Sequence, residues 1–258
     1  MPHALRLQPL LLACLTALTP ALASAKCASS HLDVWPPPGT PLPANGRVVV
    51  EGFGTDQPLV VALGEVGQPA HAWLEGAGGR VPLMVESRNI GHLQLTQAIL
   101  RPTKPLKVGT TYRLLLTRGH KVFSPRIWMA SAETQAAWTV VAADEVAPGW
   151  RSAPALGARN YTMLGCGPAV GVQVQVDLEE ATPAAVEVTL EGPQGTQRWL
   201  TPVVEGAIDI GHGMCSGAFD VAGPGDRVAT LVAVDLAGHR TAAVQPIRFA
   251  GVEESESK

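Results

Sequence analysis

A cysteine flanked by glycines is the first place in this chain where side chains could carry out chemistry. Gly213-Met214-Cys215-Ser216-Gly217 matches the pattern Gly-x-nucleophile-x-Gly, in which a sharp turn from a strand into a helix exposes the nucleophile. The segment Gly223-Pro224-Gly225 follows closely and cannot continue a helix of useful length. A cysteine-dependent hydrolase is therefore only an alternative, and we expect this chain to have no catalytic residue.

A structural role competes for the same cysteine. The sequence has four cysteines, and Cys166 and Cys215 fall in its second half. In an oxidising compartment we expect these two to form a disulfide, which would stabilise the fold by about 4 kcal/mol through chain entropy. Cys27 is then left over, either as a free thiol or as the partner of one of the other two.

Metal binding is a further alternative for this segment. His212, Met214 and Cys215 are side chains that soft metal ions accept as ligands. Neighbouring residues of a strand point to opposite faces, so His212 and Met214 could share one face with Cys215 on the other. A copper site on His212 and Met214 stays open beside the simpler interpretation, a glycine-rich loop held by Cys215, in which no cofactor is expected.

The N-terminal 25 residues have the layout of a secretory signal peptide. A weakly basic start precedes the apolar run Leu10–Leu18, and Ala23-Ser24-Ala25 is a small-x-small cleavage site. We expect cleavage after Ala25 and a secreted or periplasmic protein without a stable membrane span, because the run is shorter than the roughly 20 residues that a span needs. As an alternative, Leu11-Leu12-Ala13-Cys14 resembles a lipobox with Cys14 as the lipidated residue.

Composition bounds the class of partner. The formal net charge is −3 and no block of basic residues is present, so nucleic acid is not an expected partner. The 27 glycines and 22 prolines favour short strands joined by turns over long helices. The sequence contains no zinc-protease, phosphate-loop or dinucleotide motif and no ordered Ser-His-Asp pattern.

Short apolar segments alternate with turn signals along the first part of the chain. A spacing of about ten residues between such segments is typical of a β-sandwich or barrel. The best helix candidate is Ser131–Ala137, which is only about two turns long. The predicted strands are 47–52, 59–64, 71–76, 81–86, 92–96, 111–117 and 137–142.

The pattern is interrupted around residues 144–154 and then begins again. Strict alternation in 170–177 places Val172, Val174 and Val176 on one face, as a half-buried sheet requires. We therefore predict an all-β fold of two tandem sandwich domains after the signal peptide. Their bounds are 29–143 and 148–251, with a linker at 144–147 and a disordered acidic tail at 252–258.

Corners and turns of both predicted domains resemble the immunoglobulin-like (Ig-like) domains of bacterial envelope proteins. Residues 36–50 match the Pro/Gly-rich entry into the first strand, and residues 106–117 match the corner in which a tyrosine hydroxyl bonds back to upstream backbone. The resemblance gives Tyr112 a structural role with a buried ring. In the second domain, residues 233–240 match an Asp-x-x-Gly turn, which makes Asp235 and Gly238 structural residues.

A second similarity concerns His31, near the predicted mature N-terminus. Periplasmic copper carriers of Ig-like fold place a histidine just before a Pro/Gly-rich first strand, as His31 stands here. The N-terminal amine that those carriers use as a ligand would be absent after cleavage at Ala25. We therefore expect a non-catalytic secreted or periplasmic binding or structural protein whose partner is an unidentified protein or envelope component. The alternatives are a copper-type carrier using His212, Met214 or His31, and the hydrolase at Cys215.

Overall fold

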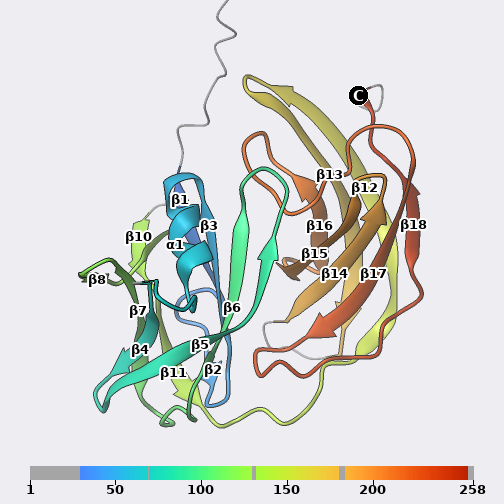
Figure 1. The fold of residues 1–258 in the computed structure, drawn as a ribbon. Coiled ribbons are helices and arrows are strands. Elements are labelled where there is room, and N and C mark those ends of the chain that lie inside the picture. Colours follow the sequence, from blue (N-terminus) through green and yellow to red (C-terminus); the bar gives the residue numbers. More distant parts are fainter. Residues whose placement is uncertain (1–29, 69, 130–131, 180–183, 255–258) are drawn as a thin grey trace, which may run out of the picture.

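The computed structural model describes residues 30–68, 70–129, 132–179 and 184–254. The regular secondary structure of these residues is almost entirely strand, which confirms the predicted all-β class. We call residues 30–143 the N-terminal half and residues 148–254 the C-terminal half, and the two stand side by side in Figure 1. In the part of the chain that the structure describes, no helix has the length and apolar character needed to cross a membrane. The predicted leader and Cys27 lie outside the described residues.

The N-terminal half is built on one hydrogen-bonded sheet of nine strands. β9 (Arg126–Met129) and β10 (Ala132–Gln135) form a separate antiparallel pair. The order across the main sheet is β1 (His31–Trp35), β3 (Val48–Phe53), β6 (Thr96–Pro102), β5 (Gly79–Ile90), β4 (Ala72–Gly76), β7 (Thr111–Arg118), β11 (Ala137–Val141) and β2 (Leu42–Pro43), with β8 (Lys121–Phe123) on β7.

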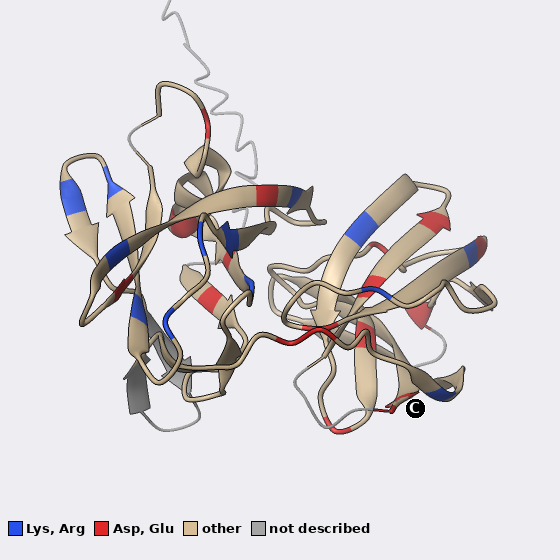
Figure 2. Cartoon of the chain, turned by 90° about the horizontal axis from the view of Figure 1, so that it is seen from below, with Lys and Arg blue, Asp and Glu red and all other residues tan. Residues whose placement is uncertain are grey.

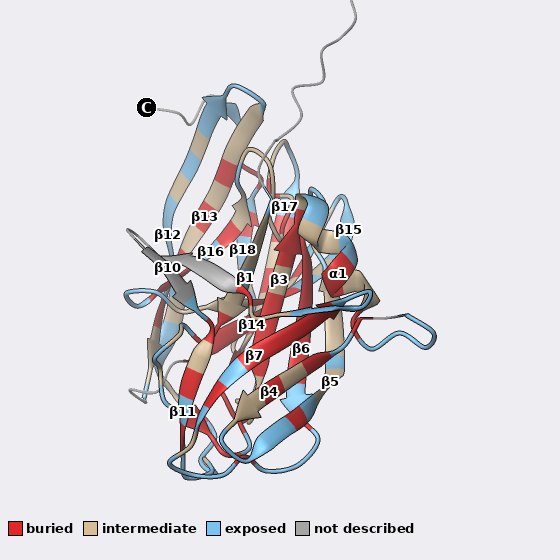
Figure 3. Ribbon diagram, turned by 90° about the vertical axis from the view of Figure 1, so that its left-hand side faces the viewer, coloured by how far each residue is buried: buried red, intermediate tan, exposed pale blue. Residues whose placement is uncertain are grey.

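The sheet curls around a single core. Leu42 at one end of the strand order and Val48 near the other are both fully buried and belong to the same apolar cluster. Tyr112, Leu114 and Leu116 alternate along β7 and all face this core, as a strand covered on one face requires. Figure 3 shows the buried residues concentrated along β3, β6 and β7.

Three local predictions for this half are wrong. The predicted strand at 92–96 is instead the turn between β5 and β6, and only Thr96 of these residues belongs to a strand. Residues 59–64 are not a strand, because the 3-10 turn η1 (Gly54–Asp56) leads into the short helix α1 (Gln57–Ala62). Pro58 lies in the first turn of α1, where a missing N–H costs nothing, and Leu59 and Leu63 are buried four residues apart on one side. Within the helix candidate 131–137, residues 132–135 instead form β10, which pairs with β9, and Ala137 begins β11, while residue 131 lies outside the described residues.

The C-terminal half consists of two sheets packed face to face. One sheet has the order β12 (Trp150–Leu164), β13 (Gly167–Leu178) and β16 (Ala207–His212). The other has the order β15 (Gly195–Pro202), β14 (Ala185–Gly192), β17 (Asp226–Val234) and β18 (Ile247–Ala250). Val172, Val174 and Val176 are buried on β13 and meet buried residues of β14 and β17 in one cluster, so the predicted alternation holds.

A third apolar cluster joins the two halves. Trp35, Val49 and Ile99 of the N-terminal half pack against Ala185, Leu200, Val234 and Leu236 of the C-terminal half. Close by, the Arg47 N–H donates to the Leu236 carbonyl at 2.7 Å. The junction of the two halves is therefore a packed interface, and the side chains described next lie at it.

Candidate metal centre at the junction of the two halves

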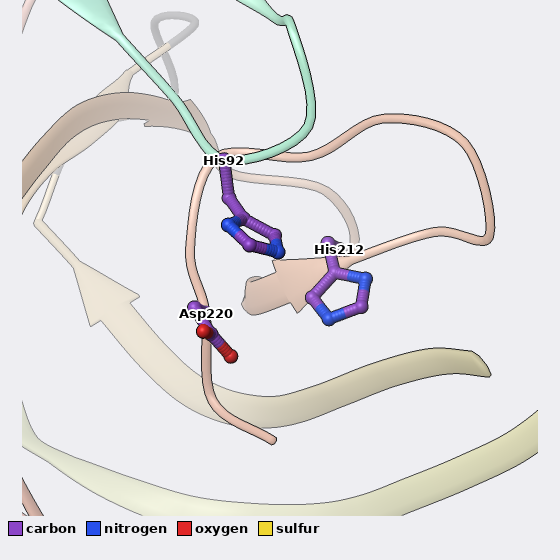
Figure 4. Close-up of side chains that lie close together, drawn as sticks. All are labelled: His92, His212 and Asp220. Carbon is purple, nitrogen blue, oxygen red and sulfur yellow. The ribbon is translucent and has the colours of Figure 1, made fainter. Parts of the chain in front are cut away.

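Two histidines and an aspartate converge at the junction. His92 lies in the turn between β5 and β6, His212 is the last residue of β16, and Asp220 lies in the segment that follows β16 (Figure 4). One potential ligand atom from each side chain lies within 4.8 Å of the other two, and all three residues are half-buried. Among the described residues, no other group of three or more His, Cys, Asp or Glu side chains converges in this way.

The alternation of β16 places the His212 ring. Ile208 and Ile210 are buried on the core side of this strand, and His212 continues the same face at its end. Gly217 folds back to bridge to His212, and a Cβ atom at Gly217 would overlap the Cβ of His212. The absence of a side chain at Gly217 is thus a condition for the position of His212.

A turn of the N-terminal half with strained backbone angles positions His92. The turn closes with the Gly91 N–H donating to the Leu95 carbonyl at 2.9 Å, and Leu93 and Gln94 both have positive φ angles, of 51° and 62°. Non-glycine residues adopt this conformation rarely. The turn rests on the C-terminal half, where the His92 N–H donates to the Ala218 carbonyl at 3.2 Å.

The Asp220 carboxylate is oriented but not neutralised. Its Oδ1 accepts a hydrogen bond from the Ala222 N–H at 3.1 Å, and its own N–H donates to the Gln197 side-chain oxygen at 2.9 Å. No Lys or Arg of the described residues forms an ion pair with it. The carboxylate charge is therefore available to a cation at the two imidazoles.

The surroundings of the two rings favour their metal-binding form. Burial lowers the pKa of His92, and the neighbouring His212, whose ring centroid is 5.0 Å away, lowers it further, while Asp220 acts in the opposite direction. The net effect favours the neutral imidazole. The Nδ1 of His212 lies 2.8 Å from the Gly213 carbonyl, which can only accept, so the proton resides on Nδ1 and leaves Nε2 free for a ligand bond.

Two imidazole nitrogens and one carboxylate oxygen form a donor set for divalent transition-metal ions. Imidazole suits Zn²⁺, Cu²⁺ and Ni²⁺, whereas Ca²⁺ and Mg²⁺ prefer oxygen donors throughout. Bonds of about 2.1 Å bring ligand atoms to roughly 3.4 Å from one another in a tetrahedral site. The described spacing thus requires small side-chain rotations to close around an ion. Three protein ligands leave one position for water.

The structure gives His212 different neighbours from those predicted. His31 lies on β1, where its Nε2 is 3.2 Å from Asp33 and its ring contacts Phe53. The Met214 sulfur accepts a hydrogen bond from the Cys166 N–H at 3.2 Å. Neither His31 nor Met214 belongs to the cluster around His212. The sequence did not predict that His92 and Asp220 lie beside His212, because no local sequence pattern connects these three residues.

The predicted disulfide between Cys166 and Cys215 is wrong. Cys166 has a free thiol and is exposed at the tip of the β12–β13 hairpin. The physical reason is that the Cys215 sulfur is engaged in a disulfide that does not involve Cys166, and Cys215 packs against the core of the C-terminal half. Met214, the residue before it, faces the hairpin tip instead. Residues 213–225 contain no helix, so the strand-to-helix turn that a nucleophile elbow needs is absent around Cys215.

The remaining predicted residues occupy a corner and a turn. The Tyr112 ring is buried, and its hydroxyl accepts a hydrogen bond from the Lys107 N–H at 3.3 Å. The Asp235 side chain is buried and accepts from the His239 N–H at 2.7 Å, while Gly238 has a φ of +85°. Asp235 and Gly238 thus form a tight turn at the end of β17.

Comparison with known proteins leaves the chain without a family. No family model matches it, and no curated protein matches it. Solved structures similar to it include a cytokine receptor complex (13% identity, 86% of this chain and 96% of that chain, TM-score 0.24). They also include the tandem Ig repeats of Dlar (12% identity, 83% and 96% coverage, TM-score 0.24). A third is the β-glucuronidase of Ruminococcus gnavus (13% identity, 80% and 36% coverage, TM-score 0.22). TM-scores this low do not establish a shared fold. The strands themselves define the class of this chain as an all-β protein.

Proposed function

We propose that this chain is a non-catalytic binding protein of the Ig-like kind and that it holds one divalent transition-metal ion between its halves. The observation that carries the proposal is the convergence of His92, His212 and Asp220 within 4.8 Å, with one ligand from the N-terminal half and two from the C-terminal half. Such an ion would tie the halves together in addition to the apolar cluster.

The environment of the three side chains supports a metal ion over a chance grouping. Asp220 has no cationic partner among the described residues, and His212 has its second nitrogen fixed by a carbonyl, as metal-binding histidines commonly do. The donor set contains no sulfur, because Met214 is turned to Cys166. The site therefore suits Zn²⁺ or Cu²⁺ better than Cu⁺.

Binding without catalysis, and a place outside the cytosol, are parts of the same proposal. The sequence lacks the motifs of the common hydrolases and nucleotide-dependent enzymes. The leader pattern of residues 1–25 supports a secreted or periplasmic protein with an envelope component as its partner. Figure 2 shows basic and acidic residues interspersed over both halves, which supports a partner other than nucleic acid.

Calorimetric titration of the metal-free protein with ZnCl₂ or CuCl₂ tests the metal site. We expect one ion per chain, with affinity reduced at least about tenfold in His92→Ala, His212→Ala and Asp220→Asn. His120→Ala is the control, because His120 is exposed in the turn between β7 and β8 and lies outside the cluster. Binding that is the same in all four variants as in the unmodified protein would refute the site.

A further inference from the structure

A carboxyl group to which no Lys or Arg of the described residues is paired lies at the junction, apart from the metal ligands. Glu51 is on β3, and its Oε1 accepts hydrogen bonds from the Gln97 side-chain amide at 2.6 Å and from the Trp199 indole N–H at 3.1 Å. Gln97 belongs to the same half as Glu51, but Trp199 is on β15 of the C-terminal half. Glu51 therefore contributes directly to the contact between the halves.

The same hydrogen-bond network binds the edge strand β15 of the C-terminal half. The Gln97 side chain is fully buried, and its amide pairs with the Leu200 backbone, donating to the carbonyl at 2.8 Å and accepting from the N–H at 3.1 Å. β15 is an edge strand of its sheet, so Gln97 satisfies backbone groups that no neighbouring strand reaches. Glu51 holds the amide of Gln97 in this orientation.

The charged groups around Glu51 do not favour a carboxylate. From β1, Asp33 is the directly paired residue, a like charge that itself contacts His31. From β6 and β15 only the neutral Gln97 and Trp199 reach it, and Arg198, the neighbour of Trp199, is directed to Glu187 instead. Glu51 is half-buried, and a desolvated carboxylate with no compensating cation costs more free energy than a neutral carboxyl in the same place.

We infer that Glu51 is a proton-controlled latch: the neutral carboxyl keeps the two halves docked, and loss of its proton weakens their contact. Oε1 still accepts from Gln97 and Trp199 when the group is neutral, so the hydrogen bonds persist in the closed state. The inference does not rest on the metal centre, although the Trp199 ring also lies beside Gly91, next to His92.

Electrostatics give the latch its pH range. The pKa of Glu51 is raised from 4.5 to about 7: burial is the main cause and the charge of Asp33 acts in the same direction, while the hydrogen bonds from Gln97 and Trp199 act against it. Because the docked-state pKa is the higher one, docking is strongest in acid and weakens as the pH rises through 7. If Glu51 regains its usual pKa on undocking, the docking equilibrium constant falls roughly 30-fold between pH 5.5 and 8.5.

Hydrogen exchange of the full chain, without added metal, measures this docking. We expect the protection of the Leu200 N–H, relative to amides of β13 within the same half, to fall about 30-fold between pH 5.5 and 8.5 after correction for intrinsic exchange rates. The Trp199 indole N–H resonance, assigned from Trp199→Phe, should shift with a midpoint near pH 7.

The Glu51→Gln variant decides the outcome. A glutamine keeps the acceptor oxygen and cannot ionise, so Leu200 protection should become independent of pH and stay at its acid value. If this variant folds poorly by circular dichroism, Asp33→Asn is the substitute, and it should move the midpoint to lower pH. Protection that changes equally with pH in Glu51→Gln and in the unmodified protein would overturn the latch. Because no metal is present, that result would leave the metal centre untouched.

Discussion

Gly238 and Arg47 belong to different halves of the chain, and their backbone and guanidinium lie in direct contact. A Cβ atom at Gly238 would overlap the guanidinium of Arg47, which is held in place by a two-point ion pair with Glu86. The turn at the end of β17 is therefore shaped by the other half of the molecule.

Gly238→Ala should be more destabilising than strain alone explains. A non-glycine residue at φ +85° costs roughly 1–2 kcal/mol, and displacement of Arg47 adds to this. Gly39→Ala is the matched control, because Gly39 has the same φ of +85° with nothing within 4 Å of its Cβ position. Urea unfolding should show a clearly larger loss of stability for Gly238→Ala, and equal losses would contradict the junction contact.

Gly217→Ala should weaken metal binding although it removes no ligand. The added methyl group would displace His212, so we expect the affinity for Zn²⁺ to fall about 10- to 100-fold. Gly213→Ala tests the specificity of the effect, since a Cβ atom added at Gly213 would lie 3.4 Å from its nearest neighbour, the Ser216 carbonyl oxygen. The two affinities are compared by calorimetry, and an unchanged value for Gly217→Ala would argue against His212 as a ligand.

Tyr112→Phe should cost about 0.5–1.5 kcal/mol of unfolding free energy. It removes the hydroxyl that accepts the Lys107 N–H and leaves the buried ring in place. Tyr161→Phe serves as comparison, because the Tyr161 hydroxyl has no hydrogen-bond partner among the described residues. Denaturant unfolding of both variants checks this, and an effect of Tyr161→Phe as large as that of Tyr112→Phe would remove the corner hydrogen bond as the explanation.

Glu187 should contribute to stability in the opposite pH direction from Glu51. Burial raises its pKa, but hydrogen bonds from Arg240 and Arg198 outweigh this, so the net pKa is lowered. The carboxylate therefore stabilises the fold above about pH 4.5, and this contribution is lost as the pH falls further. Unfolding free energies between pH 3 and 6 should vary less in Glu187→Gln than in Glu191→Gln, whose residue is exposed on the same strand.

Cys166 should react as a free thiol in the folded protein. It is exposed at a hairpin tip, so iodoacetamide added under native, non-reducing conditions should alkylate it at the rate expected for a solvent-exposed thiol. Peptide mapping locates the label, and Cys166→Ser provides the blank. A cystine-linked peptide containing Cys166 and Cys215 in a non-reducing digest would show that the structure is wrong at this point.

Local pattern was sufficient for most of the strands but not for all of them. The alternation of Val172, Val174 and Val176 can be recognised without tertiary information, because one buried face of a strand imposes a period of two. Residues 59–64 carry a short continuous apolar run, which fits a buried strand as well as a helix. In the structure this run lies in and directly after the helix α1, and Leu59 and Leu63 pack in the core of the N-terminal half.

The sequence by itself determined the all-β class, the alternating core strands and the turn chemistry around Asp235 and Gly238, since each depends on neighbours within a few residues. Only the tertiary structure decided which side chains meet. His92 reaches His212 because a β-turn of one half docks on the other, and Glu51 reaches Trp199 across the same junction. Contacts between distant residues follow from how the two cores pack together, and no spacing along the chain records that packing.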